Sequence, residues 1–204
     1  MTVIQAHSAD EFLRPRRWTH DEYYALYDAD FFDEQRVELL DGEIWRLPPQ
    51  SPRHVYCILQ AIDLLKTAFG AGFNVRQQGP FVVSEYTEPE PDILVVSGSW
   101  RDYANHHPAP AEAHLLVEVS DAWTLAKDKS RKLEIYAEAA IAEYWIVNLV
   151  NRQLEVYRDP APLNDSYAYK ITMALVDGSS VAPLSAPNST IAVADLFPPA
   201  ERPE

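Results

Sequence analysis

The chain lacks several features that define common classes of protein. It contains one cysteine, Cys57, so no disulfide can form within the chain, and this is typical of a reducing compartment. No apolar run approaches the roughly 20 residues that a membrane-spanning helix needs. Residues 1–10 also lack the apolar core of a signal peptide. We therefore expect a cytoplasmic protein that does not enter a membrane.

Positive charge is also scarce. The 204 residues include 17 Lys and Arg against 31 Asp and Glu, which gives a formal net charge of -14. Proteins that bind nucleic acids usually carry a basic surface, and a strongly negative chain repels a polyanion at long range. This balance argues against tight, sequence-independent DNA binding. It leaves room for a local basic cleft or for a substrate bridged by a metal ion.

The length and the hydrophobic content of the chain predict one folded domain over residues 1–204. Hydrophobic residues make up 47% of the sequence, enough for a sizeable core. We expect an irregular lead-in at 1–17, a core at 18–158, and a C-terminal strand with a proline-rich tail at 159–204. The motifs that indicate a glycine-rich phosphate loop, a zinc-protease helix or a nucleophile elbow do not occur.

Alternating helix and strand signals predict an α/β (α+β) fold. Thr19 and Glu22 form a capping-box pattern at the start of a short helix. Asp41-Gly42 predicts the tight turn of a hairpin over 36–47, and Ser51-Pro52 begins a longer helix. Further predicted elements are a strand-rich stretch at 73–84, strands at 93–96, 115–117, 144–147, 154–157 and 167–176, a helix from about 128 to 140, a turn at 159–162, and a short helical segment at 194–197.

Two carboxylates adjoin the apolar runs that we interpret as buried strands. Asp92 precedes the run 93–96, and Glu118 ends the run 115–117. A carboxylate beside buried apolar surface is costly unless something compensates it. The spacing allows a strand, a loop and a return strand, so the two strand ends can lie side by side. Hard oxygen ligands suit Mg²⁺ or Mn²⁺, and Glu38 could complete the site from the hairpin.

A lysine follows the two acids at helical spacing. Lys132 lies one turn before Tyr136, on the apolar side of the predicted helix. An amine beside metal-binding carboxylates can orient or deprotonate the attacking water, or stabilise charge on a phosphate. The pattern therefore predicts phosphodiester cleavage, with Asp92, Glu118, Lys132 and Glu38 as catalytic residues.

Taken together, these motifs resemble the Uma-type family of putative restriction endonucleases, which belongs to the PD-(D/E)XK phosphodiesterase superfamily. The resemblance covers roughly residues 19–158 and rests on motifs in the right order. They are the hairpin sequence 37–43, His54, Pro91-Asp92, Glu118-Val119-Ser120, Asp128 with Lys132 and Tyr136, and the run 143–147.

The resemblance implies a restriction-endonuclease-like core, a mixed sheet flanked by helices, with a metal site at Asp92 and Glu118 and Glu38 as a further acid. The usual lysine of the superfamily lies two residues after the second acid, where this chain has Ser120. Lys132 on the helix takes its place. His54, Gln78 and Tyr136 are possible accessory residues.

We accordingly expect a homodimeric endonuclease that uses Mg²⁺ or Mn²⁺ to hydrolyse DNA, with RNA as an alternative substrate. One rival is a catalytically degenerate protein of the same fold that acts as a binding or scaffold module; another is a metal-free protein-interaction module. The site residues also have structural alternatives. Asp92 could be a turn residue, Glu118 could form a structural salt bridge with Lys132 or Lys129, and Glu38 could lie on the exposed face of its strand.

Overall fold

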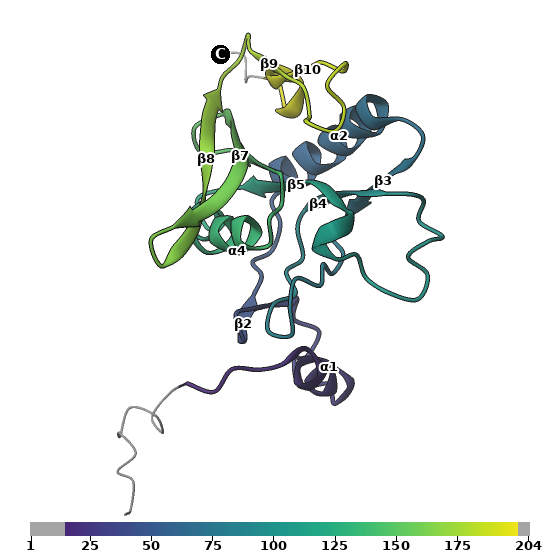
Figure 1. Cartoon of the computed structure of the whole chain (residues 1–204), viewed down its shortest axis with the longest axis vertical. Coiled ribbons are helices and arrows are strands. Elements are labelled where there is room, and N and C mark those ends of the chain that lie inside the picture. Colours follow the sequence, from purple (N-terminus) through teal and green to yellow (C-terminus); the bar gives the residue numbers. More distant parts are fainter. Residues whose placement is uncertain (1–14, 200–204) are drawn as a thin grey trace, which may run out of the picture. The chain divides into compact units, whose positions relative to one another are not determined.

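The structure is a computed structural model that describes residues 15–199. Most of the predicted lead-in at 1–17 therefore lies outside the described residues. The chain divides into two compact units, which are described separately (Figure 1). The first comprises the chain up to Leu47 together with Ser84–Glu88, and the second comprises Pro48–Val83 and the chain from Pro89 onward. Whether both belong to one domain stays a prediction.

The first unit contains the predicted short helix and hairpin. Helix α1 (His20–Asp28) begins at Thr19, and both hydrogen bonds of the capping box are present. Strands β1 (Val37–Leu40) and β2 (Glu43–Arg46) form an antiparallel hairpin. The turn residues Asp41 and Gly42 have φ values of 51° and 80°, which is the conformation that favours Asp-Gly in two-residue turns.

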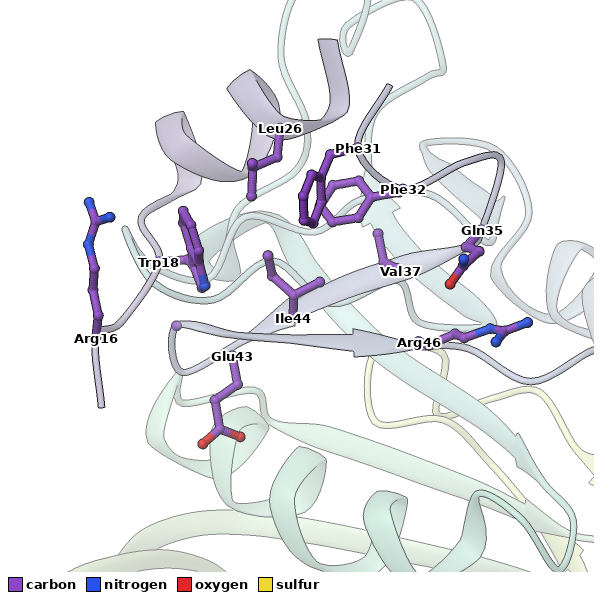
Figure 2. A pocket seen from close by; sticks show the side chains of 11 residues that line it. Arg16, Trp18, Leu26, Phe31, Phe32, Gln35, Val37, Glu43, Ile44 and Arg46 are labelled. Carbon is purple, nitrogen blue, oxygen red and sulfur yellow. The ribbon is translucent and has the colours of Figure 1, made fainter. Parts of the chain in front are cut away.

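A pocket of about 500 Å³ lies between α1 and the hairpin. Figure 2 shows aromatic side chains facing the hairpin, with Arg16 and Arg46 at opposite ends. None of the residues that the sequence predicts for the metal site lines this pocket. Its lining residues are Arg16, Trp18, Leu26, Phe31, Phe32, Gln35, Val37, Gly42, Glu43, Ile44 and Arg46.

The second unit is built on a six-stranded sheet with the order β3-β4-β5-β6-β7-β8. Neighbouring strands are antiparallel except β5 and β6, which are parallel. The predicted mixed sheet flanked by helices is therefore confirmed. The strands are β3 (Phe73–Gln77), β4 (Ile93–Ser97), β5 (Ala113–Ser120), β6 (Glu143–Asn148), β7 (Gln153–Leu163) and β8 (Ser166–Leu175).

The two faces of this sheet are covered differently. Helix α2 (Pro52–Phe69), capped by Ser51 as predicted, packs its apolar side on one face. The crossover from β5 to β6 consists of a short α3 (Leu125–Lys127), a π-helical turn (Asp128–Lys132) and α4 (Leu133–Glu138). Because side chains alternate along a strand, Val117 and Val119 face α2, whereas Glu118 contacts α4 from the other face.

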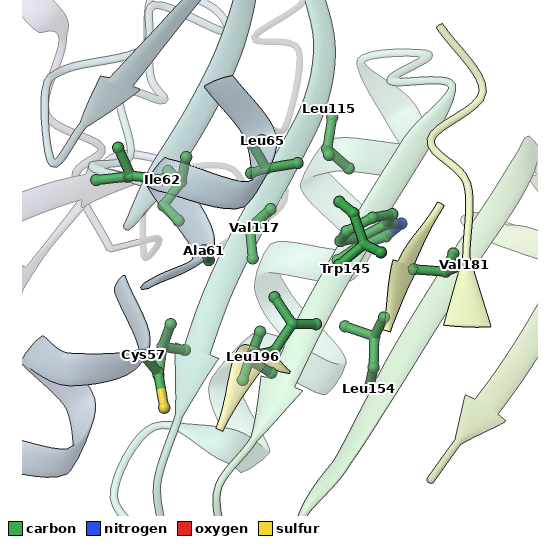
Figure 3. Packing of buried hydrophobic residues seen from close by; sticks show 14 of the residues in the cluster. Cys57, Ala61, Ile62, Leu65, Leu115, Val117, Trp145, Leu154, Val181 and Leu196 are labelled. Atoms are coloured by element: carbon green, nitrogen blue, oxygen red, sulfur yellow. The ribbon is translucent and has the colours of Figure 1, made fainter. Parts of the chain in front are cut away.

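The main core lies between α2, the sheet and the C-terminal tail. Figure 3 shows Cys57 and Leu65 of α2 close to Val117 and Trp145 of the sheet and to Leu196 of the tail. The tail contains the short strands β9 (Ser180–Val181) and β10 (Ile191–Ala192) and a 3₁₀ turn (Val193–Leu196). A second 3₁₀ turn (Pro110–Glu112) precedes β5. The predicted helical segment near 194–197 is thus confirmed as a 3₁₀ turn that packs on the core.

Two sequence predictions need correction. Residues 159–162 are not a turn, because β7 continues to Leu163 and pairs Pro160 with Tyr169 and Pro162 with Tyr167. Proline is tolerated where a strand does not need its N–H for the ladder, and the turn falls instead at 164–165. In the stretch 73–84, only Phe73–Gln77 forms a strand of the sheet. Within residues 15–199, no helix has the length and apolar content to cross a membrane.

Truncating Leu196 should destabilise the protein if the tail is part of the core. Its side chain is fully buried, so Leu196→Ala should cost about 2–5 kcal/mol of unfolding free energy through lost contacts and a residual cavity. The control Leu184→Ala, at a side chain that is 45% exposed, should change stability by less than about 0.5 kcal/mol. Urea denaturation measures both, and equal effects would contradict the packing role of the tail.

Candidate active site

The register of β4 and β5 brings the two predicted carboxylates to neighbouring strand ends. Ile93, the first residue of β4, pairs with Val117 in this antiparallel ladder. Asp92 therefore lies just before β4, and Glu118 lies near the end of β5. Both are nearly buried, with 8% and 4% of their surface exposed. The two strand ends therefore lie side by side, as the spacing predicted.

Asp92 is held by three donors. Gln78 Nε2 donates to its Oδ1 at 3.0 Å, and the backbone N–H of Val119 donates to its Oδ2 at 2.8 Å. His54 Nε2 lies 3.2 Å from Oδ1. Burial raises the pKa of Asp92, but the hydrogen bond and charge of His54, with the other donors, outweigh it and lower the pKa below its usual value. Asp92 is therefore ionised at neutral pH, and the turn-residue alternative does not account for these contacts.

The contact with Asp92 shifts the pKa of His54 upward, whereas the pKa of Asp92 is lowered. Its burial disfavours the protonated ring, but the hydrogen bond to Asp92 and the charges of Asp92, Asp121 and Asp128 raise its pKa above the ordinary value. His54 comes from the first turn of α2. The accessory position that the sequence predicted for His54 and Gln78 is thus beside Asp92.

Glu118 accepts hydrogen bonds from the crossover helix. Lys132 Nζ and the hydroxyl of Tyr136 each donate to Glu118 Oε1 at 2.9 Å. The Lys132 side chain is only 3% exposed, so it does not point to solvent. Residues four apart share one side of a helix, which explains why both reach the same oxygen.

The contact between Lys132 and Glu118 is also the structural salt bridge considered as an alternative. The other candidate partner, Lys129, pairs instead with Glu155 on β7 at 2.7 Å. Geometry alone is compatible with a structural ion pair and with a catalytic pair. Measurements of metal binding and activity separate the two.

Ser120 and Asp128 belong to the site but were not predicted as site residues. Ser120 Oγ donates to Asp128 Oδ2 at 2.8 Å, and both residues are buried. Burial raises the pKa of Asp128, although Lys132 and Lys127 oppose this shift. The sequence did carry a signal, because Asp128 precedes Lys132 by four residues and Ser120 follows Glu118 on the same face of the strand.

Glu38 lies in the first unit, on β1. Its side chain is fully buried, so the alternative that it occupies an exposed face of the hairpin is wrong. Its part in a metal site stays a prediction.

The donor chemistry of the site fits a hydrated hard cation. Among residues 15–199, no group of three or more His, Cys, Asp and Glu side chains could form a metal cage by itself. Mg²⁺ is usually bound by one or two carboxylates together with water and substrate phosphates. Asp92 and Glu118 supply two carboxylates at neighbouring strand ends, which matches the number of protein ligands in a site of that kind.

The mixed sheet with this acid–lysine cluster defines a nuclease-like α/β protein. Residues 20–194 match the model of the Uma2 family, whose description is "Putative restriction endonuclease". Because the match spans most of the chain, the protein belongs to this family, and the resemblance seen in the motifs is confirmed.

A solved structure has the same fold. It is described as "a putative nuclease belonging to DUF820 from Anabaena variabilis", and it aligns with a TM-score of 0.67 and 14% sequence identity. The alignment covers 88% of this chain and 97% of that one. A search of curated proteins gave no match.

The pair formed by His54 and Asp92 should make stability depend on pH. A raised His54 pKa means that its contribution is complete below the unfolded value of 6.5 and is lost as pH rises through the folded pKa. A lowered Asp92 pKa means that its contribution is present above 3.8 and is lost as pH falls through the folded pKa. The stability difference between wild type and His54→Gln should therefore be largest between pH 3.8 and 6.5.

Urea denaturation across a pH series measures this difference. In an Asp92→Asn background, His54→Gln should show no such maximum, because the double-mutant cycle removes the pair. A difference that is flat across the pH series in the wild-type background would refute the coupling.

Proposed function

We propose that this protein is an endonuclease that uses Mg²⁺ or Mn²⁺ to hydrolyse phosphodiester bonds in DNA. The observation that carries the proposal is the buried pair Asp92 and Glu118 on adjacent strands, with Lys132 Nζ 2.9 Å from Glu118. Membership of a family described as restriction endonucleases supports the reaction class. Asp92 and Glu118 would hold the ion, which when bound polarises the phosphodiester and lowers the pKa of a coordinated water.

The contacts of the site indicate what the protein's own side chains do. His54, Gln78 and the Val119 N–H fix both oxygens of Asp92, which orients that carboxylate before the substrate arrives. Tyr136 and Lys132 orient Glu118 in the same way. Positioned groups of this kind need little reorganisation during the reaction, which is the main source of electrostatic catalysis.

Lys132 acts as a cation in this proposal. The Lys132 amine donates to the Glu118 carboxylate, so it is suited to stabilise negative charge on the phosphate and to orient water by donation. It is less suited to remove a proton from that water. Hydrolysis then leaves a 5′-phosphate, as the family resemblance implies.

A homodimer is part of the proposal, because one such site cuts one strand and cleavage of a duplex requires two. The rival is a non-cleaving member of the family that binds or scaffolds. Its motivation was the formal net charge of -14 and the lysine displaced from the strand. The second motivation is weakened by the direct contact of Lys132 with Glu118.

Cleavage of supercoiled plasmid in Mn²⁺ tests the catalytic assignment. Wild type should nick the plasmid, and Lys132→Met should reduce the rate by about 10²–10³-fold, as for loss of a group that stabilises transition-state charge. Asp92→Asn should be inactive. The matched control is Lys129→Met in the same helical turn, whose lysine pairs with Glu155 rather than Glu118; it should cleave like wild type. Equal cleavage by all four proteins would indicate a contaminant and overturn the assignment.

Thermal unfolding with and without Mn²⁺ tests the ligand set independently of activity. A ligand that binds only the native state stabilises it by about 2.7 kcal/mol at a concentration of 100 times Kd, so Mn²⁺ should raise the Tm of wild type. Asp92→Asn and Glu118→Gln should lose this metal-dependent shift, whatever their Tm without metal. Glu155→Gln, at another buried carboxylate, should retain it. A shift that survives in Asp92→Asn would remove the metal-ligand assignment, and no shift in wild type would favour the metal-free rival.

A further inference from the structure

A second group of residues lies near the candidate active site, at the C-terminal ends of β5 and β6. Strands β5 and β6 are parallel, so both end at the same edge, where the Leu149 N–H donates to the Ser120 carbonyl at 2.8 Å. Strand β4 is antiparallel to β5, so its first residues lie at this edge beside Asp92. The loop after β4, with Trp100, therefore leaves from the opposite end.

A pocket of about 200 Å³ opens at this edge. It is lined by residues that directly adjoin the site in sequence, since Ser51 lies three residues before His54 and Asp121 follows Ser120. The His54 N–H donates to Ser51 Oγ at 3.2 Å, so the pocket borders the residue that contacts Asp92. The remaining lining residues are Arg53, Ala122, Leu149 and Val150.

Two exposed side chains at this pocket have no structural task in the described part of the chain. Arg53 is exposed, and within residues 15–199 no ion pair involves it. Trp123, the residue after the lining residue Ala122, is 84% exposed. Its loop is nevertheless fixed, because the Trp123 N–H donates to Asp121 Oδ1 at 2.8 Å and the Leu125 N–H donates to the Asp121 carbonyl at 3.0 Å.

An exposed aromatic ring and an unpaired cation beside a nuclease-like site are the groups that bind an unpaired strand. Bases stack on aromatic side chains, and arginine neutralises backbone phosphates. A base inside a continuous duplex is already stacked on its neighbours and cannot cover Trp123. The carboxylate of Asp121 and the apolar side chains of Leu149 and Val150 also make the pocket better suited to a base than to a phosphate.

We propose that Arg53 and Trp123 hold an unpaired DNA strand at the active site, with Arg53 on a backbone phosphate and Trp123 stacked on a base. This inference rests on the proposed nuclease function and names its substrate as single-stranded or locally opened DNA. The formal net charge of -14 accords with it, because such a chain gains little from long-range attraction and depends on local contacts.

Binding of a fluorescein-labelled oligo(dT) and of a duplex of equal length, followed by anisotropy, tests the proposal. The full-length protein is used in EDTA and again in Ca²⁺, so that binding is measured apart from Mn²⁺-dependent cleavage. Wild type should bind the single strand more tightly than the duplex. Trp123→Ala should weaken single-strand binding about tenfold, the effect of losing one base stack. Arg53→Ala should reduce the slope of log K against log salt by about 0.7, the loss of one phosphate contact.

The matched controls are Trp100→Ala and Arg101→Ala, an exposed tryptophan and arginine on the loop after β4. They should bind like wild type. Any of three results would overturn the proposal. They are effects in Arg53→Ala and Trp123→Ala no larger than in these controls, tighter binding of the duplex, or no binding of the single strand.

Plasmid cleavage by the same proteins keeps this proposal distinct from the proposed function. If wild type cleaves the plasmid and both variants bind the single strand normally, the strand-binding inference is wrong and the proposed nuclease function stands. If both variants lose single-strand binding and wild type does not cleave the plasmid, the strand-binding surface is supported and the proposed nuclease function is wrong.

Discussion

The structure of the site depends on the compensation of two carboxylates buried on adjacent strands. Burying an ionised carboxylate is costly unless it is paired and hydrogen-bonded. Asp92 is compensated by His54, Gln78 and a backbone N–H, and Glu118 by Lys132 and Tyr136. These partners come from α2, the end of β3, β5 itself and the crossover helix. The two acids therefore tie together elements that are distant in sequence, and the site forms only when the second unit is folded.

The same face of the sheet contains another buried acid, which clarifies what is special about Glu118. Glu118 pairs with Ile146 and Ile146 with Glu155 across β5, β6 and β7. Lys129, with Tyr157, Asn148 and Gln153, lowers the pKa of Glu155 to about 2 against the effect of burial. The ion pairs Lys129–Glu155 and Lys132–Glu118 thus help to hold the crossover helix to the sheet. The second pair lies at the strand end next to Asp92, and it is therefore the pair that we place in the proposed metal site.

The sequence predicted those features that depend on local chemistry. The cap at Thr19, the turn at Asp41-Gly42 and the cap at Ser51 each involve contacts within a few residues. The adjacency of the strand ends at Asp92 and Glu118 followed from two apolar runs with a loop between them. The inward direction of Lys132 followed from its spacing to Tyr136. These arguments needed only periodicity and turn propensity.

Features that depend on contacts between elements were not predictable in this way. Pro160 and Pro162 are strong turn signals, but pairing with β8 overrides them. The π-helical turn at Asp128–Lys132 cannot be seen in an apolar pattern, because one extra residue in a turn changes the period too little. The bond between Ser120 and Asp128 joins a strand to a helix, and neither residue type indicates by itself that it is buried.

The bond between Ser120 and Asp128 attaches the segment that carries Lys132 to β5. In the superfamily pattern, the position of Ser120 is occupied by the lysine, on the same face as the second acid. Here Ser120 donates to Asp128, which begins the turn that carries Lys132. The strand position therefore anchors the segment that carries Lys132. Because a π-helical turn changes the direction of the residues after it, this anchor fixes the angle at which Lys132 and Tyr136 approach Glu118. We expect the position of the Lys132 amine to depend on the Ser120–Asp128 contact, because that contact joins β5 to the turn from which Lys132 extends.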